Sequence, residues 1–105
     1  MADFVLLYSG GSMPETEEEQ AQALKAWQSW LGEVGDAVKD EGNPFSPAAK
    51  TIAPDGAVSD AGGALATGYS IVKAGSLDEA TTIAKGSPVL QGGGSVTVYE
   101  TFDVM

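Results

Sequence analysis

Two oxygen-bearing side chains flank a small, glycine-rich stretch and could together support acid/base chemistry. Asp60 begins the stretch 60–67, which has too few large apolar side chains to pack and predicts a mobile loop beside a sheet. Tyr69 follows at the start of an expected strand, where its hydroxyl could act as a hydrogen-bond donor or acid. Asp60 and Tyr69 are therefore the candidate catalytic residues. The alternatives are that Asp60 caps a turn and that Tyr69 is a core aromatic with its hydroxyl at the rim.

Three further residues are candidates for ligand binding. Trp27 lies on an apolar helical stripe, where it could form a ligand platform or a core or dimer contact. Asn43 lies in a predicted turn and could form a hydrogen bond with a ligand, although turn formation alone also explains it. Glu100 shares one face of an alternating strand with Val96 and Val98. A carboxylate buried there must be paired, have a raised pKa or bind something, unless the strand bulges or leaves the sheet.

The residue types that are missing exclude several chemistries. The 105 residues carry a formal net charge of −10 and contain no cysteine and no histidine, and all five basic residues are lysines. Disulfides, thiolate nucleophiles, Ser-His-Asp triads and cysteine or histidine metal sites are therefore excluded. Nucleic acid is not an expected partner, because five lysines against fifteen acidic residues form no basic stripe.

Neither a metal nor a cofactor is expected. The carboxylates between positions 15 and 19 radiate around a helix start, which is typical of a solvated face. The glycine run 92–94 precedes a strand and lacks the following Lys-Ser/Thr of a phosphate loop.

Length and hydropathy predict one domain over residues 1–105 that does not associate with membranes. A chain of this size buries one core. It contains no run approaching the roughly 20 apolar residues of a membrane span and no basic n-region of a signal peptide. A cytoplasmic location is the expectation.

The elements that must position these residues follow from hydrophobic spacing and helix caps. Two helices are expected, one after Thr16 with Glu19 as a capping box and Gly35 as its end, and one after Ser76 with Glu79 as a capping box. Strands are expected at 4–8, 37–40, 50–53, 57–59, 68–73 and 95–104, the third and fourth joined by Pro54-Asp55-Gly56.

This order predicts an α+β fold, a ferredoxin-like βαββαβ subunit with two helices on one face of an antiparallel sheet. The opposite face would then be uncovered. Because Leu7 or Tyr8, Ile71, Val96 and Val98 must supply apolar surface to both sides, face-to-face homodimerisation is the simplest expectation.

The same segments resemble the YCII-related family, also called DGPF-domain proteins, of the dimeric α/β-barrel superfamily. The resemblance covers most of the chain. It is carried by these blocks: the strand Phe4 to Tyr8 with Gly10-Gly11, the Trp-bearing helix ending at Gly35, Glu41-Gly42-Asn43-Pro44-Phe45, Gly68-Tyr69-Ser70-Ile71, Ser76-Leu77-Asp78-Glu79-Ala80, and Gly92-Gly93-Gly94-Ser95-Val96. It implies a dimeric α/β barrel with a cleft near the sheet in each subunit.

At the motif that names the family, the chain reads Ser59-Asp60-Ala61-Gly62-Gly63, which keeps the Asp and lacks the Pro-Phe. A His-Asp acid/base unit, attributed to some relatives, is impossible here because the chain has no histidine. Two functions stay open. The first is a homodimer that binds a small metabolite or performs acid/base chemistry near Asp60. The alternative is a non-catalytic binding or assembly module acting through its dimer face and acidic surface.

Overall fold

The structure is a computed structural model that describes residues 2–10, 16–46, 48–60 and 66–102. Its elements run in this order: β1 (Ala2–Ser9), α1 (Glu17–Val34), the short 3-10 helix η1 (Gly35–Ala37), β2 (Val38–Asp40), β3 (Lys50–Ile52), β4 (Val58–Asp60), β5 (Ala66–Ala74), α2 (Leu77–Ala84), the 3-10 helix η2 (Pro88–Leu90) and β6 (Ser95–Glu100).

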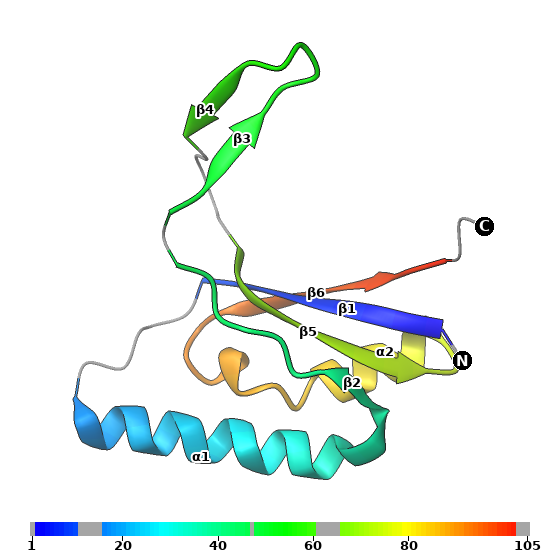
Figure 1. Cartoon of the computed structure of the whole chain (residues 1–105). Coiled ribbons are helices and arrows are strands. Elements are labelled where there is room, and N and C mark those ends of the chain that lie inside the picture. The colour runs from blue at the N-terminus through cyan, green and yellow to red at the C-terminus, as the bar shows by residue number, and fades with distance from the viewer. Residues whose placement is uncertain (1, 11–15, 47, 61–65, 103–105) are drawn as a thin grey trace.

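Four of the strands form one antiparallel sheet with the order β2-β5-β1-β6. Figure 1 shows α1 and α2 on the same side of this sheet. The central strands β1 and β5 are the first and third of the four sheet strands along the chain, so each βα unit contributes one inner strand. The expected α+β, ferredoxin-like βαββαβ subunit is confirmed.

The core lies between the sheet and the two helices. β1 contributes Phe4, Leu6 and Tyr8, which alternate with half-buried residues as expected for a strand with one fully covered face. α2 contributes two buried alanines, Ala80 and Ala84. Small side chains let this helix lie close to the sheet, and the indole of Trp30 on α1 completes the core.

Both predicted helix starts are confirmed by their caps. The Glu19 backbone N–H donates to Thr16 Oγ1 over 3.0 Å, and the Glu79 N–H donates to Ser76 Oγ over 3.1 Å. α1 ends at Gly35, whose φ of 62° is the positive value expected of a glycine end. Local sequence therefore determines where α1 and α2 begin.

The predicted hairpin is present as a separate two-stranded sheet. β3 and β4 pair in antiparallel register, with Ile52 opposite Val58. Figure 1 shows that this hairpin rises from the main sheet on the side opposite the helices. We refer to residues Lys50–Asp60 as the arm.

The last strand differs from the expectation. β6 ends at Glu100 instead of continuing to position 104, and Phe102 is 82% exposed. Residues 103–105 lie outside the described part of the chain. Val96 and Val98 pair with Tyr8 and Leu6, so they face the helices. The expectation that they contribute to the uncovered face is wrong, because paired residues of neighbouring strands share one face.

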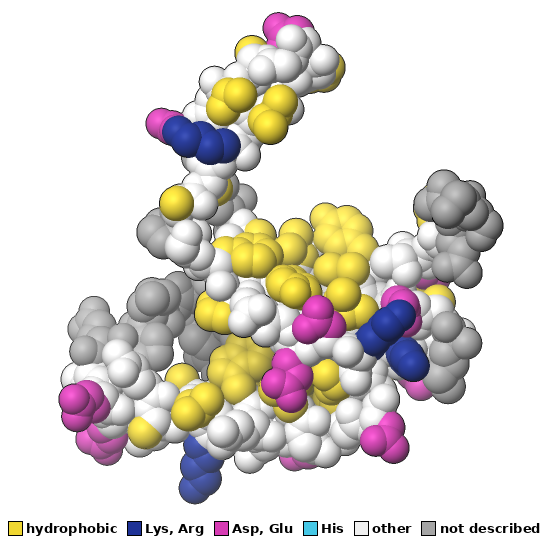
Figure 2. All heavy atoms as spheres, in the orientation of Figure 1, with side chains coloured by type: hydrophobic (Ala, Val, Ile, Leu, Met, Phe, Trp, Pro, Cys, Tyr) yellow, Lys and Arg dark blue, Asp and Glu magenta, His cyan; other side chains and the backbone are white. Residues whose placement is uncertain are grey.

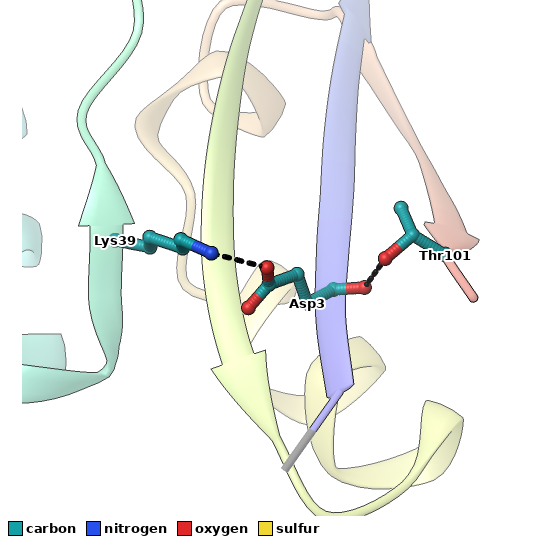
Figure 3. Close-up of polar contacts among 3 residues, drawn as sticks. All are labelled: Asp3, Lys39 and Thr101. Atoms are coloured by element: carbon teal, nitrogen blue, oxygen red, sulfur yellow. Dashed lines mark hydrogen bonds and ion pairs between the residues drawn. The ribbon is translucent and has the colours of Figure 1, made fainter. Parts of the chain in front are cut away.

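Asp3 on β1 and Lys39 on β2 form an ion pair across the intervening strand β5 on the uncovered face, with 2.5 Å between Lys39 Nζ and Asp3 Oδ2 (Figure 3). The Thr101 hydroxyl donates to the Asp3 carbonyl oxygen over 2.7 Å, tying the end of β6 to β1. Both partners of the ion pair are partly exposed, so it adds little stability.

Neither described helix is long and apolar enough to cross a membrane.

Candidate functional site

A pocket of 390 Å³ lies between α1 and one end of the sheet. Its wall is made by α1, by β1 and β5, by the loop after β2 and by η2. The lining residues are Tyr8, Leu24, Trp27, Leu31, Glu41, Gly42, Asn43, Pro44, Thr67, Gly68, Tyr69, Ser70 and Val89. Most of these side chains are apolar or aromatic, and none of the described lining residues is a lysine. The pocket therefore suits a small, largely apolar molecule.

Gly42 allows the loop after β2 to form one wall of the pocket. Its φ of +77° is unfavourable for other residues, and a Cβ at this position would lie 1.6 Å from the carbonyl oxygen of Tyr69. The Gly42 N–H donates to Asp40 Oδ1 over 2.8 Å, and Phe45 N–H donates to the Thr67 carbonyl oxygen over 2.8 Å. These bonds hold the intervening Asn43 against β5 at the pocket.

A directed chain of hydrogen bonds lies at the sheet side of the pocket. The Tyr8 hydroxyl donates to Ser70 Oγ over 2.7 Å, and the Ser70 hydroxyl donates to the carbonyl oxygen of Glu41 over 2.8 Å. Tyr8 is 5% exposed and Ser70 is 1% exposed. These two hydrogen bonds join β1, β5 and the loop after β2. The hydroxyl protons of Tyr8 and Ser70 are both used in them.

Burial raises the pKa of the Tyr8 hydroxyl, and hydroxyl groups of Ser70 and Ser87 nearby lower it in part. Tyr8 is therefore a neutral phenol at physiological pH, not a base. Ser87 Oγ is buried and has no hydrogen bond of ordinary geometry to any described residue, although it lies close enough to Tyr8 to influence its pKa. The Tyr8 oxygen retains acceptor capacity, since its proton is committed to Ser70.

Trp27 provides the aromatic wall. Its ring meets the Tyr8 ring edge to face, with centroids 5.2 Å apart, and meets Trp30 in the same way at 5.7 Å. Trp30 is fixed in turn, because its indole N–H donates to the Ile83 carbonyl oxygen over 3.2 Å. Trp27 is only half-buried, so it is available to a ligand while its orientation is set by its neighbours.

Tyr69 borders the pocket, but alternation along β5 directs its side chain to the opposite face from Ser70. There its ring stacks on Phe45, with centroids 5.9 Å apart, and its hydroxyl donates to Asp40 Oδ2 over 3.1 Å. The hydrogen bond to Asp40 raises the pKa of Tyr69, because the phenolate form would lose that bond and meet the carboxylate charge.

Of the five candidate residues, the structure brings Trp27 and Asn43 to the pocket, and Tyr69 borders it while its hydroxyl lies on the other face of the sheet. Asp60 is not among the lining residues. It ends β4 on the arm, where its 86% exposed side chain forms an ion pair with Lys50. The structure thus does not place Asp60 beside Tyr69 in one cleft. Of the loop expected at 60–67, Asp60 belongs to β4, residues 66 and 67 belong to β5, and residues 61–65 lie outside the described part of the chain.

Glu100 also lies away from the pocket. It pairs with Phe4 on the face toward the helices, as alternation predicts, but it is exposed because β6 ends there. Of the two alternatives for Glu100, the structure supports the one in which the strand ends there and the carboxylate faces solvent.

Tyr8, Ser70 and Gly42 were not among the candidate residues. The sequence does hold one signal for Tyr8, which ends an apolar strand: a buried phenol needs a hydrogen-bond partner, so a polar residue is expected beside it. The identity of that partner, 62 positions along the chain, has no local signature.

The described residues contain no group of three or more acidic side chains arranged to hold a metal ion.

No protein-family model matches this sequence, and no curated protein matches it. A solved structure of 5-chloro-2-hydroxyhydroquinone dehydrochlorinase from Burkholderia phenoliruptrix, in complex with 2,5-dihydroxybenzoquinone, is similar to this chain with a TM-score of 0.53. The two sequences are 16% identical, and the match covers 94% of this chain and 93% of that chain. At this identity the likeness concerns the fold.

Proposed function

We propose that this protein binds a small, uncharged, largely apolar molecule in the pocket between α1 and the sheet. The observation that carries the proposal is that Trp27 and the Tyr8–Ser70 hydrogen-bond chain lie side by side in the wall of a pocket of 390 Å³. The aromatic wall offers contact area, and the few polar groups fix orientation.

Charge limits the class of ligand. Glu41 is the single acidic residue among the described lining residues, and the whole chain carries a net charge of −10. An anionic ligand would find no cation to compensate its charge, so an uncharged molecule is favoured. A planar ring with one or two hydroxyl groups matches both the aromatic wall and the acceptor capacity of Tyr8.

The structural neighbour supports the ring shape of the ligand by analogy, since it holds a six-membered ring bearing oxygen atoms. The preference for an uncharged ring rests on the charges of this chain alone. Together with the sequence resemblance, the neighbour supports a place for this chain among YCII-like proteins that act as cytoplasmic homodimers, the uncovered sheet faces packing together. Acid/base chemistry in the pocket would use the neutral Tyr8 phenol, and Asp60 would join it only through a rearrangement of the arm.

The test is the shift in thermal unfolding caused by two probes, hydroquinone and 2,5-dihydroxybenzoquinone. Hydroquinone is neutral, whereas the dihydroxyquinone is an anion at neutral pH. A probe at ten times its dissociation constant stabilises by about 1.4 kcal/mol, which corresponds to a shift of roughly 5 to 10 °C for a domain of this size. We expect hydroquinone to stabilise the protein more than the anion does.

Trp27→Ala should abolish the shift, and Asp60→Asn should leave it unchanged. A shift that survives Trp27→Ala contradicts the proposed pocket. A shift that disappears in Asp60→Asn returns Asp60 to the site. If neither these probes nor any molecule retained in native mass spectrometry binds, the alternative stands, a non-catalytic assembly module acting through its dimer face.

A further inference from the structure

The arm Lys50–Asp60 stands clear of the globular body. Figure 1 shows it rising from the side of the sheet that the helices do not cover. All residues of β3 and β4 are exposed. With four residues on each side of its turn, the arm is about 13 Å long, whereas two stacked sheets lie about 10 Å apart. The arm is therefore long enough to pass the full thickness of a second sheet placed on this face.

One face of the arm exposes two large apolar side chains. Ile52 and Val58 are a cross-strand pair, so their side chains lie on the same face, and they are 69% and 63% exposed. The ion pair Lys50–Asp60 lies on this face too, at the root of the arm. Thr51 and Ser59 form the pair between these two pairs, and they lie on the other face. An isolated two-stranded hairpin is marginally stable in water. An arm that exposes a pair of large apolar side chains is typical of an element that covers them on a partner.

The uncovered face of the sheet continues this apolar surface. Figure 2 shows hydrophobic side chains gathered on the sheet below the arm and again along the arm itself. On the sheet they include Val5, Leu7 and Ile71, which are half-buried, and Tyr99, which is 52% exposed.

Charge on this face does not oppose a second copy. Its described charged residues are Asp3, Lys39, Asp40 and Lys73, whose formal charges cancel. The acidic first turns of α1 and α2 lie on the helix side of the sheet. A chain with a net charge of −10 can thus meet a copy of itself on this face without strong repulsion.

The sheet face alone is small for a stable dimer. A strand residue covers roughly 16 Å² of sheet plane, so the strands present on the order of 400 Å². A stable interface buries about 800 Å² on each partner. The arm can supply further area, and a hollow of 450 Å³ at its root leaves room for side chains of the partner. This hollow is lined by Pro44, Phe45, Ser46, Ala48, Ala49 and Ala66.

From this geometry we infer that the arm is a clasp for a second copy of this chain, with Ile52 and Val58 of each copy packing on the flank of the other. The inference rests on the proposed homodimer and adds to it the element that holds the two subunits together. By two-fold symmetry each copy gives one arm and receives one.

The decisive comparison uses two aspartate variants of the arm. Val58→Asp places a charge in the apolar pair Ile52–Val58, and its neighbour Ser59→Asp places the same charge on the opposite face. Sedimentation equilibrium of the full chain should give a dimer dissociation constant at least about tenfold higher for Val58→Asp, with Ser59→Asp within about twofold of the wild type. Equal constants for Val58→Asp and the wild type overturn the inference.

Hydrogen exchange of the unmodified protein gives a second reading that does not depend on a variant folding. The Ala53 N–H donates to the Ala57 carbonyl oxygen near the tip of the arm. If the arm clasps a partner, protection of this amide falls when the protein is diluted below its dimer dissociation constant. Protection that does not change with dilution overturns the inference.

These outcomes separate the arm from the rest of the proposed function. If the dimer is tight and Val58→Asp does not weaken it, the role of the arm is contradicted and the dimer through the sheet face still stands. If the wild-type protein is monomeric at millimolar concentration, both the role of the arm and the dimer through the sheet face are contradicted. Neither result affects the pocket, whose test is the thermal shift caused by hydroquinone.

Discussion

The hydroxyl of Tyr8 donates to Ser70 Oγ over 2.7 Å, joining the first strand of the chain to a strand that begins almost sixty residues later. Because the Ser70 hydroxyl in turn donates a hydrogen bond to the Glu41 carbonyl oxygen, the two bonds connect the two central strands to the loop that forms one wall of the pocket. The same pair thus belongs to the fold and to the candidate site.

Tyr8→Phe should lower the free energy of unfolding by about 1 kcal/mol, the usual contribution of a hydrogen bond of this kind. The ring remains to contact Trp27, and Ser70 keeps its bond to Glu41. Urea unfolding measures the change. Tyr99→Phe is the control, since Tyr99 is 52% exposed, and it should change stability by less than about 0.5 kcal/mol. An equal loss in both variants would contradict the role of the Tyr8 bond.

Stability should fall above about pH 10, and Tyr8 should account for part of the fall. Burial raises the pKa of Tyr8 above its ordinary value of 10.0, so the neutral phenol is favoured in the folded state. This contribution is complete below the unfolded pKa and is lost as the pH rises through the folded pKa. Urea unfolding at a series of alkaline pH values should therefore show a shallower decline for Tyr8→Phe. Parallel declines would contradict the raised pKa.

Gly42→Ala should destabilise the protein by about 3 kcal/mol or more, because the new Cβ would collide with the Tyr69 carbonyl oxygen at 1.6 Å. The matched control is Gly56→Ala at the tip of the arm. Gly56 also has a positive φ, of +89°, but its Cβ would meet nothing within 4 Å. The control should cost only about 1 to 2 kcal/mol for the backbone conformation. If both cost the same, close approach of the loop to β5 is not what requires glycine at position 42.

Leu7→Lys should weaken the proposed dimer at least about tenfold, because it places a charge in the centre of the uncovered sheet face. Leu7 lies on β1, which is flanked by β5 and β6. The control is Leu90→Lys on η2, a residue that is already 41% exposed. Sedimentation equilibrium measures the dissociation constants, and a dimer unaffected by Leu7→Lys would rule out face-to-face packing.

Gly32→Ala should raise the free energy of unfolding by about 0.5 to 1 kcal/mol. Gly32 is exposed within α1, and its Cβ would meet nothing within 4 Å. The gain arises because alanine restricts the unfolded chain and favours the helix. A loss of stability would indicate that Gly32 faces a partner too closely to accept a methyl group.

The sequence by itself determined the elements whose causes are local. Capping side chains lie three residues from the backbone groups they accept from, so the starts of α1 and α2 could be predicted from Thr16 and Ser76. Pro54-Asp55-Gly56 likewise predicted the turn of the arm. Two-residue alternation and three- to four-residue spacing then determined which faces are apolar, and the order of elements predicted the ferredoxin-like subunit.

Only the tertiary structure decided which side chains form the pocket. Trp27 and Asn43 had sequence signals of their own, but Tyr8 and Ser70 meet through pairing of strands far apart in the chain. It also placed Asp60 on the arm and left Glu100 exposed at the end of β6. The physical reason is the distance along the chain over which each interaction acts. Caps and turns act within a few residues, whereas the position of a site depends on the register of distant strands and on where each strand ends.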